Sequence, residues 1–479
     1  MPDDIGPNAI GEAERTDATA HAALRELIAL VDLPASMAAH ARIVGGEPVI
    51  PTRYRVGTAG AAALAATGLA AAELWRLRTG RQQTVEVPMR PATISLRSGR
   101  YMRINDKPPG REWDPLSGFY PTRDGRWVML HTNFANLRDA AARVVGTPVD
   151  RDAVTKAVAG WDAEALETAL HENGACGAFA RTHAEWAAHP HAIAIRDLPV
   201  VEIIRIGDAP PQPLPEGPRP LSGVRALDLT RVIAGPTCAR TLAEHGADVL
   251  KISRADLPHS GELDLETGIG KLSAHLDLRD PAQAETLRGL IRTADVFSQS
   301  YRPGALAARG FSPEAVAALR PGIVCVTLSA WSHAGPWRNR RGYDTIVQTS
   351  TGMAHASGVE GKPQHLPVSA IDYVSGNLMA FGAMVALTRR ATIGGSWLVR
   401  VSLATTGRWI VDRGVFAAVQ VDGLAADLPD DEIAPLCTEV DAPDGRIRYL
   451  SPIVRMSETP PHWDRPPVPL GYHQAVWPG

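Results

Sequence analysis

Asp372 lies in the setting that most suggests chemistry in this chain. It follows the extended Leu366-Pro367-Val368 and precedes a run rich in Ala, Leu and Met that is typical of a buried helix. An Asp at the start of a helix ordinarily caps that helix. It can also act as a nucleophile that attacks an activated acyl group and forms a mixed anhydride. Composition alone does not choose between these two roles.

The segment around Asp372 has a second copy near the N-terminus, in which the acid is missing. A gap-free alignment pairs Arg76 with Arg390, Gly80 with Gly394, Val85 with Val399, Val87 with Val401, and Thr58 with Asp372. Two copies of one helix–turn–strand unit indicate a duplicated scaffold. Because only one copy keeps the carboxylate, we expect a single chemical site per chain.

The second half of the chain alternates short apolar segments with helical ones. The pattern predicts strands at 224–229, 247–252, 294–298 and 322–328, and helices at 236–245, 284–293 and 312–319. Apolar strands that alternate with helices are typical of a parallel, doubly wound (Rossmann-like) sheet. We therefore predict an α/β fold in which this sheet is one domain and a smaller α+β domain accompanies it.

Proline marks the main domain boundary. Six prolines fall between positions 210 and 220, a density that excludes a helix or a central strand and indicates a linker. Four segments follow from this boundary. They are a leader at 1–45, a degenerate first copy at 46–220, the sheet domain at 221–410, and a C-terminal small-domain or linker portion at 411–479.

The composition of the chain argues against several classes of function. The net charge of -3 at pH 7 provides no field that would gather nucleic acid. The four cysteines are scattered without CxxC spacing, which favours reduced thiols in a cytoplasmic protein and no metal site. The longest apolar run, 59–75, is Ala-rich and contains Glu73, so we expect a buried helix there and no membrane span.

Basic residues gather near the predicted carboxyl ends of several strands. The first strand–helix turn, 230–237, has one glycine and neither a GxGxxG nor a Walker pattern, which disfavours NAD and ATP. Open α/β sheets bind ligands at the carboxyl ends of their strands. Each cation alone is an ordinary surface charge, but their repeated placement favours an anionic, phosphate-bearing ligand. These residues are Lys251, Arg254, Lys271 and Arg302.

Residues 224–410 resemble the class III CoA-transferases of the CaiB/BaiF type. Residues 45–220 and 411–479 resemble the later, small-domain and linker portions of the same family, so a partial first copy precedes a fuller second copy. The number and order of the matching pieces make the resemblance strong. These pieces are 227–232, 234–236, 246–252, 270–271, 276–278, 294–296, 301–304, 335–336, 342–344 and Asp372.

The resemblance implies an acyl-CoA:carboxylate CoA-transferase that uses coenzyme A thioesters as substrates. The aspartate matching Asp372 would attack the acyl-CoA and pass through an anhydride and an aspartyl-CoA thioester. Arg254, Lys271 and Arg302 would contact the CoA phosphates. The attacking carboxylate must be ionised, so we expect nearby cations or amide donors to hold its pKa low. The resemblance also implies an interlocked homodimer; alternatively, the extra copy takes the partner's place within one chain.

Three departures keep other functions open. Ser253 stands where the family usually has an acid, and Leu272 where it often has a second basic residue. Tyr343 stands where the related α-methylacyl-CoA racemases have a catalytic histidine, and a tyrosine titrates too high to replace it. His355 and His365 lie near enough in sequence to substitute. A racemase is therefore the alternative enzyme, and a non-catalytic CoA-binding subunit is the alternative from another class.

Overall fold

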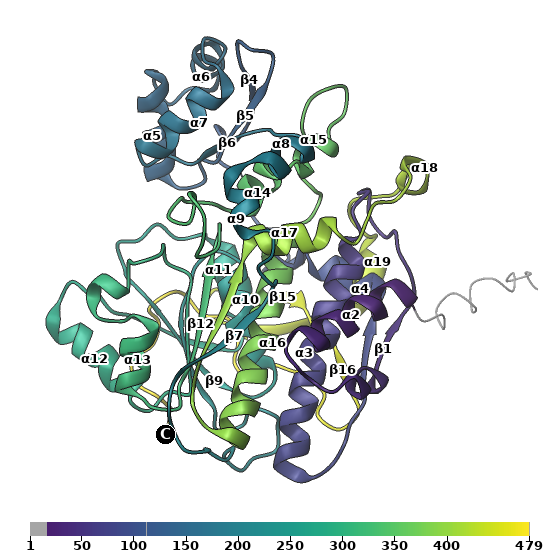
Figure 1. Ribbon diagram of the computed structural model, residues 1–479, viewed down its shortest axis with the longest axis vertical. Helices are drawn as coiled ribbons and strands as arrows, with labels where there is room; N and C mark the ends of the chain where they lie inside the picture. The colour runs from purple at the N-terminus through teal and green to yellow at the C-terminus, as the bar shows by residue number, and fades with distance from the viewer. Residues whose placement is uncertain (1–16, 112, 479) are drawn as a thin grey trace, which may run out of the picture.

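The computed structural model describes residues 17–111 and 113–478. Two long helices lie side by side at its centre, α3 (Val56–Thr79) and α16 (Ala370–Ile393) (Figure 1). Each has 24 residues, and the two begin and end at positions that the gap-free alignment pairs. Both are followed by a glycine with positive φ, Gly80 at 75° and Gly394 at 70°. The predicted pair of equivalent helices is therefore present.

A seven-stranded sheet forms the larger domain, in the order β10-β9-β8-β11-β12-β13-β7. All strands are parallel except β7, which pairs antiparallel with β13. The predicted doubly wound α/β fold is confirmed. The strands are β7 (Glu202–Gly207), β8 (Arg225–Leu229), β9 (Asp248–Ser253), β10 (Lys271–His275), β11 (Val296–Gln299), β12 (Val324–Ser329) and β13 (Ser396–Ser402).

Helices cover both faces of this sheet. On one face α10 (Ala234–Glu244) and α16 pack on alternate strand residues such as Val296 and Val399. On the other face α12 (Pro281–Ile291) and α13 (Pro313–Leu319) pack on the intervening residues, such as Phe297 and Leu398. Successive residues of a strand point to opposite faces, so this division follows directly from the apolar runs in the sequence.

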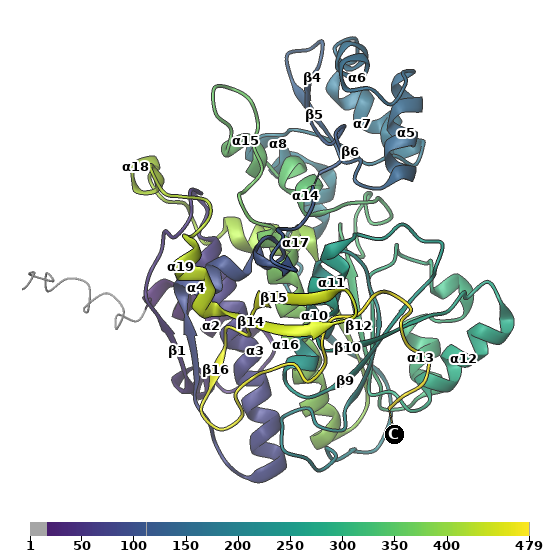
Figure 2. The same ribbon diagram turned by 180° about the vertical axis from the view of Figure 1, so that it is seen from behind.

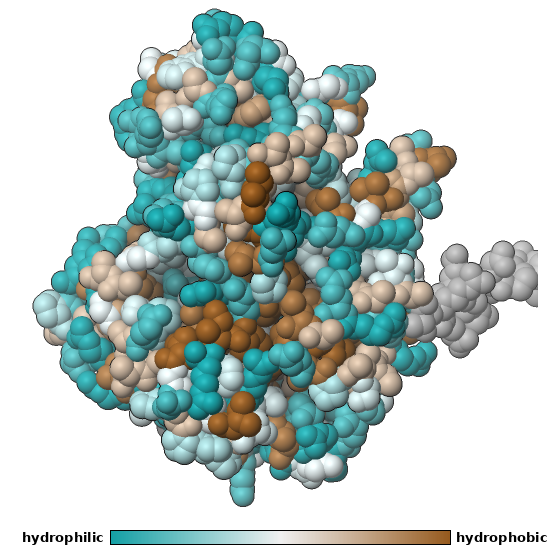
Figure 3. Space-filling model, in the orientation of Figure 1, coloured by the Kyte–Doolittle hydropathy of each residue, from teal (hydrophilic) through white to brown (hydrophobic). Residues whose placement is uncertain are grey.

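Two strands of the sheet were not predicted. The segment that forms β10 mixes polar with apolar residues, and β7 lies at 202–207 in the part assigned to the first copy. The three isoleucines of β7 are half-buried, and Figure 3 shows apolar side chains gathered over β7 and α16. A strand from the first copy thus completes the sheet of the second.

The reverse exchange occurs in a smaller sheet. There β2 (Val85–Pro88) pairs parallel with β1 (Ala41–Val44) and antiparallel with β16 (Arg455–Met456). Since β2 follows α3 as β13 follows α16, β2 and β13 have equivalent neighbours: one parallel strand and one antiparallel strand. The antiparallel strand comes from the other half of the chain in both cases, so the two halves are interlocked.

The small domain has its own core and lies at the top of Figure 1. Its hairpin turns at Asp124-Gly125, with Gly125 at φ 72°. A second hairpin, β14 (Cys437–Ala442) and β15 (Gly445–Leu450), turns at Asp444-Gly445 (Figure 2). The small domain contains β4 (Gly118–Pro121), β5 (Trp127–Leu130), β6 (Gly177–Phe179), α5 (Ala135–Val145), α6 (Arg151–Val158) and α7 (Ala163–Glu172).

Shorter elements connect these parts. Residues 1–16 of the expected leader lie outside the described residues, and its remainder forms α2 and β1. Both α3 and α16 are long and apolar enough to cross a membrane, but they are almost wholly buried by the rest of the fold. Further helices and one strand are α2 (Ala18–Leu30), α4 (Met89–Ser95), α8 (His183–Ala188), α9 (Pro190–Ile195), α11 (Glu262–Gly268), α14 (Asp344–Ser350), α15 (Met353–Ala356), α17 (Leu403–Val411), α18 (Ala418–Val421), α19 (Asp430–Ile433) and β3 (Arg103–Ile104).

Candidate active site

Asp372 occupies the first turn of α16, where the helix dipole favours negative charge. Its side chain is buried, with 6% of the residue exposed. One turn further on, Gly376 lets the start of α10 approach, because a Cβ there would lie 2.5 Å from the carbonyl oxygen of Ala234. The amino ends of α16 and α10 therefore meet next to Asp372.

A second carboxylate, Asp344, fixes the backbone at Asp372. Its Oδ2 accepts the backbone N–H of Asp372 at 2.9 Å, and its Oδ1 accepts the amide of Gln348. The Gln348 Oε1 in turn accepts the N–H of Leu366 at 2.8 Å. Sequence analysis noted Asp344 only as part of a matching motif; its contact with Asp372 spans 28 positions, which no local pattern reveals.

The electrostatics of this pair contradict the expectation of a low pKa. Burial, followed by the charge of Asp344, raises the pKa of Asp372 well above its ordinary value. Burial also raises the pKa of Asp344, although hydrogen bonds from the backbone of Asp372, the side chain of Gln348 and the backbone of Ile371 oppose that rise. Among the described residues, no basic side chain forms an ion pair with either carboxylate. Without substrate, Asp372 therefore holds its proton more tightly than an exposed aspartate does.

The equivalent position in the first copy, Thr58, has no carboxyl group that could act as a nucleophile. Thr58 in the first turn of α3 donates its backbone N–H to Glu47 Oε2 at 3.0 Å and its hydroxyl to Glu47 Oε1 at 2.5 Å. A carboxylate thus receives the same backbone N–H in both copies. In the first copy the Thr58 hydroxyl also donates to that carboxylate. In the second copy the side chain of Asp372 is itself a carboxyl group, which Asp344 repels when both are ionised.

Aromatic side chains from the N-terminal half cover the residue before Asp344. The ring of His131 stacks on Tyr343 with centroids 4.1 Å apart, and Phe134 lies 6.0 Å from the same ring. Burial raises the pKa of Tyr343 and lowers that of His131 to about 3, so both are neutral near pH 7. His131, which lies more than 200 positions before Tyr343, was missed by the sequence analysis.

The two histidines considered as substitutes are in different surroundings. His365 packs against Phe119, with ring centroids 4.7 Å apart, and burial lowers its pKa to about 4. His355 is exposed on α15. Neither histidine has surroundings that mark it as the general base that would remove a proton from the carbon next to a thioester carbonyl.

The turn between β8 and α10 lies where the strand order reverses, the usual ligand site of doubly wound sheets. Arg231 donates its backbone N–H to the Ser300 hydroxyl at 3.2 Å, which joins this turn to the loop after β11. Val232 has φ 71°, a left-handed conformation that is strained for a β-branched residue. Such strain is characteristic of functional turns.

Two of the predicted CoA contacts flank this turn. Arg254 follows β9 and pairs with Asp256, and its side chain is 28% exposed. Arg302 follows β11 and is exposed. Because β9 and β11 are the two neighbours of β8, Arg254 and Arg302 follow the strands on either side of β8.

The predicted position of Lys271 is wrong. It begins β10 rather than following a strand, and only 1% of it is exposed. Its ammonium donates to Asp228 Oδ2 at 2.7 Å and to the carbonyl of Pro236 at 2.8 Å. Lys251 is likewise buried inside β9 and donates to the Thr230 carbonyl at 3.1 Å. Both lysines support the β8–α10 turn from below.

The model of CoA-transferase family III matches residues 33–202 and 221–423. The chain belongs to CoA-transferase family III. It is therefore an enzyme that transfers CoA. The described residues contain no group of three or more His, Cys, Asp or Glu side chains that could hold a metal ion.

Two curated relatives of this family III CoA-transferase cover most of its length. It is 28% identical to the acetyl-coenzyme A transferase nodX of Hypoxylon pulicicidum, over 79% of this chain and 73% of that protein. It is 26% identical to an acyl-CoA transferase of Gibberella moniliformis, over 89% of each chain. The crystal structure of Rv3272 from M. tuberculosis is 29% identical over 39% of this chain and 56% of that one, with a TM-score of 0.37.

Proposed function

We propose that this family III CoA-transferase moves CoA from an acyl-CoA donor to a carboxylic acid, with Asp372 as the nucleophile. The observation that carries the proposal is the difference between two equivalent helix starts. The third residue of α16, beside the β8–α10 turn, is Asp372, whereas the third residue of α3 is Thr58. The names of the relatives, an acetyl-coenzyme A transferase and an acyl-CoA transferase, support acyl-CoA as the donor.

The proposed reaction has two symmetrical halves. The ionised Asp372 attacks the thioester carbonyl, the C–S bond breaks, and an aspartyl-acyl anhydride and CoA thiolate form. The thiolate attacks the Asp372 carbonyl and releases the first carboxylate, which leaves an aspartyl-CoA thioester. The acceptor carboxylate displaces the thiolate to form a second anhydride. Attack of the thiolate on its acyl carbonyl then yields the new acyl-CoA and restores Asp372.

Asp372 must lose its proton before the first attack. The raised pKa of the carboxyl disfavours the ionised form in the absence of substrate. An ionised carboxylate that is poorly solvated is also a stronger nucleophile than one stabilised by cations. The fixed backbone of Asp372, held by Asp344, keeps the carboxylate at the amino end of α16.

For CoA itself, we propose that Arg254 and Arg302 contact the phosphates. Guanidinium groups match phosphate oxygens in charge and geometry, and both lie at the carboxyl edge of the sheet. The role first assigned to Lys271 becomes indirect, because its ammonium is occupied by Asp228 and Pro236. In this proposal Lys271 holds the turn on which CoA rests.

Trapping of the intermediate tests the mechanism. The enzyme is incubated with acyl-CoA and hydroxylamine, digested and analysed by mass spectrometry, and we expect a hydroxamate on the peptide that contains Asp372. Asp372→Asn is the inactive control, and Thr58→Val is the matched control at the equivalent position. Turnover without modification of Asp372 would exclude the covalent mechanism.

Two alternatives predict different results. A racemase would exchange the α-proton of its substrate with deuterated water, and a transferase would not. A non-catalytic CoA-binding subunit would keep CoA affinity and show no turnover before or after Asp372→Ala. His365 is buried with a lowered pKa and His355 is exposed on α15, so transfer is the function we propose.

The assembly belongs to the same proposal. The resemblance implies a homodimer, but the exchange of β7 and β16 supports the alternative in which the N-terminal copy takes the partner's place within one chain. The break in the family match at 203–220 supports a domain boundary at the proline-rich linker. Light scattering at enzyme concentrations used for turnover distinguishes an active monomer from a dimer. A cytoplasmic location is also part of this proposal.

A further inference from the structure

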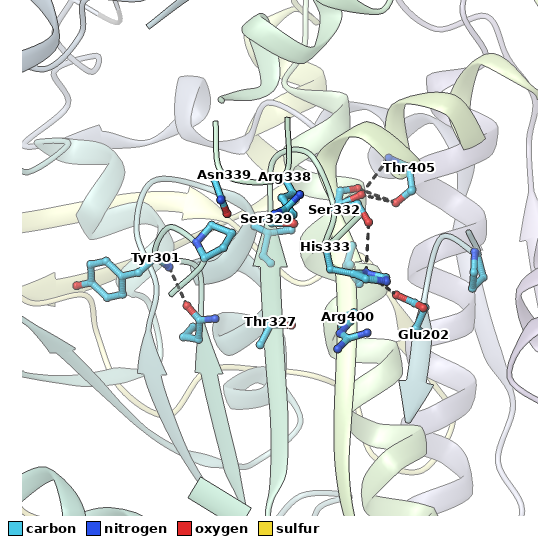
Figure 4. Close-up of a pocket in the computed structure, with 16 residues that line it drawn as sticks. Glu202, Tyr301, Thr327, Ser329, Ser332, His333, Arg338, Asn339, Arg400 and Thr405 are labelled. Atoms are coloured by element: carbon cyan, nitrogen blue, oxygen red, sulfur yellow. Dashed lines mark hydrogen bonds and ion pairs between the residues drawn. The ribbon is translucent and has the colours of Figure 1, made fainter. Parts of the chain in front are cut away.

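A polar cleft opens at the carboxyl ends of β11, β12 and β13, apart from Asp372. Its volume is about 330 Å³, within the range of small-molecule sites. Figure 4 shows Arg400 on its strand below the opening, and Arg338 and Asn339 on the loop above it. We call this space the Arg400 cleft.

Arg400 lies on the opposite face of the sheet from the helix that bears Asp372. Leu398 of β13 belongs to the core under α12 and α13, whereas Val399 and Val401 pack toward α16. Since strand residues alternate between faces, Arg400 points to the same side as Leu398. The helix that bears Asp372 is on the other side.

Arg400 is the unusual group in this cleft. It is half-buried near the carboxyl end of β13, and no side chain among the described residues forms an ion pair or hydrogen bond with its guanidinium. Its partner in strand register is Glu202. The Glu202 carboxylate instead lies 3.4 Å from Nδ1 of His333. A half-buried cation is costly unless an anion accompanies it.

The remaining lining suits an oxyanion. Arg338 adds a second guanidinium, which donates to the Gly335 carbonyl at 3.4 Å and forms no ion pair with another described residue. Ser329 offers a hydroxyl from the end of β12, and Ser332 another that contacts His333 at only 3.4 Å. Two guanidinium groups face one carboxylate, so the cleft has an excess of positive charge.

We propose that the Arg400 cleft binds a small oxyanion, a carboxylate or phosphate, at a site separate from Asp372. Arg400 would hold two oxygens of the anion through paired N–H donors, and Arg338 would close the exposed side. The inference goes beyond CoA transfer and does not depend on the reaction at Asp372.

Calorimetric titration tests the proposal, with succinate and inorganic phosphate as probes at constant ionic strength. We expect the wild-type enzyme to bind one equivalent of at least one probe, and the tighter probe to identify the anion class. Arg400→Gln should weaken binding by about ten- to hundredfold, the usual effect of a lost charge-assisted contact. Arg25→Gln on α2, exposed and outside the cleft, is the matched control and should bind as the wild type does.

Two further measurements decide the remaining outcomes. Arg338→Gln at the exposed rim repeats the test without altering the sheet, should Arg400→Gln unfold. Titration of the probe into enzyme saturated with CoA should give the same affinity for the probe as titration without CoA. Three results would overturn the proposal of a separate site. They are no binding of either probe by the wild type, binding by both cleft variants as tight as that of the wild type, and displacement of the probe by CoA.

Discussion

Replacing Lys271 by Met separates a supporting lysine from a phosphate ligand. Lys271 and Asp228 are 1% and 0% exposed, and their charged atoms are 2.7 Å apart. Removing one partner of a buried ion pair typically costs about 3–5 kcal/mol, because the other charge remains buried. Here Lys251 and the two donors of Thr230 still stabilise Asp228, so we expect about 3 kcal/mol, the lower end of that range.

The assay is urea unfolding of the wild type, Lys271→Met, Asp228→Asn and the double variant. The double variant should recover part of the loss, since it leaves no uncompensated charge, and the cycle then gives the coupling of the pair. CoA affinity is measured by calorimetry on the folded protein. If Lys271→Met lowered CoA affinity tenfold while changing the unfolding free energy by less than about 1 kcal/mol, the supporting role would be refuted.

Three other substitutions test the charges near the two helix starts and in the core. Asp344→Asn should lower the pKa of Asp372 and move the acidic limb of kcat/KM to lower pH; an acidic limb at the same pH as in the wild type would contradict the repulsion between the two carboxyl groups. Thr58→Val removes a donor from buried Glu47, so it should cost about 1–3 kcal/mol in unfolding by urea and leave kcat/KM unchanged. Burial raises the pKa of Glu244 from 4.5 to about 8, so the folded state keeps a proton that the unfolded state has lost, and stability falls as pH rises through that window. Glu244→Gln should therefore gain up to about 4 kcal/mol over the wild type between pH 5 and pH 8; a difference independent of pH would refute this.

The sequence predicted the parts of the fold that leave a periodic pattern. The ends of α3 and α16 follow from the gap-free register because glycines stop both helices at equivalent points. By contrast, β10 has no such signature, because its alternating polar residues resemble a loop. The resulting error misplaced Lys271, which was read as lying beyond a strand when it begins one.

The site was predictable in its nucleophile but not in its surroundings. Asp372 could be singled out because an equivalent helix start lacks it. Asp344 and His131 could not, because their roles depend on contacts across 28 and more than 200 positions. Burial, which determines whether a carboxylate has a high or low pKa, also depends on such distant contacts. The expected low pKa of Asp372 was therefore the least secure inference from sequence.

The two helix starts show how one scaffold yields both a stable junction and a reactive group. In each copy a carboxylate accepts the N–H of the third helical residue, Glu47 for Thr58 and Asp344 for Asp372. The Thr58 hydroxyl satisfies its carboxylate, so that junction stabilises the fold. At the other junction two buried carboxylates oppose each other, which costs stability and keeps Asp372 poorly solvated. Because the backbone geometry is shared, the difference in chemistry follows from the side chain alone: the same helix start becomes reactive when a carboxylate replaces the hydroxyl.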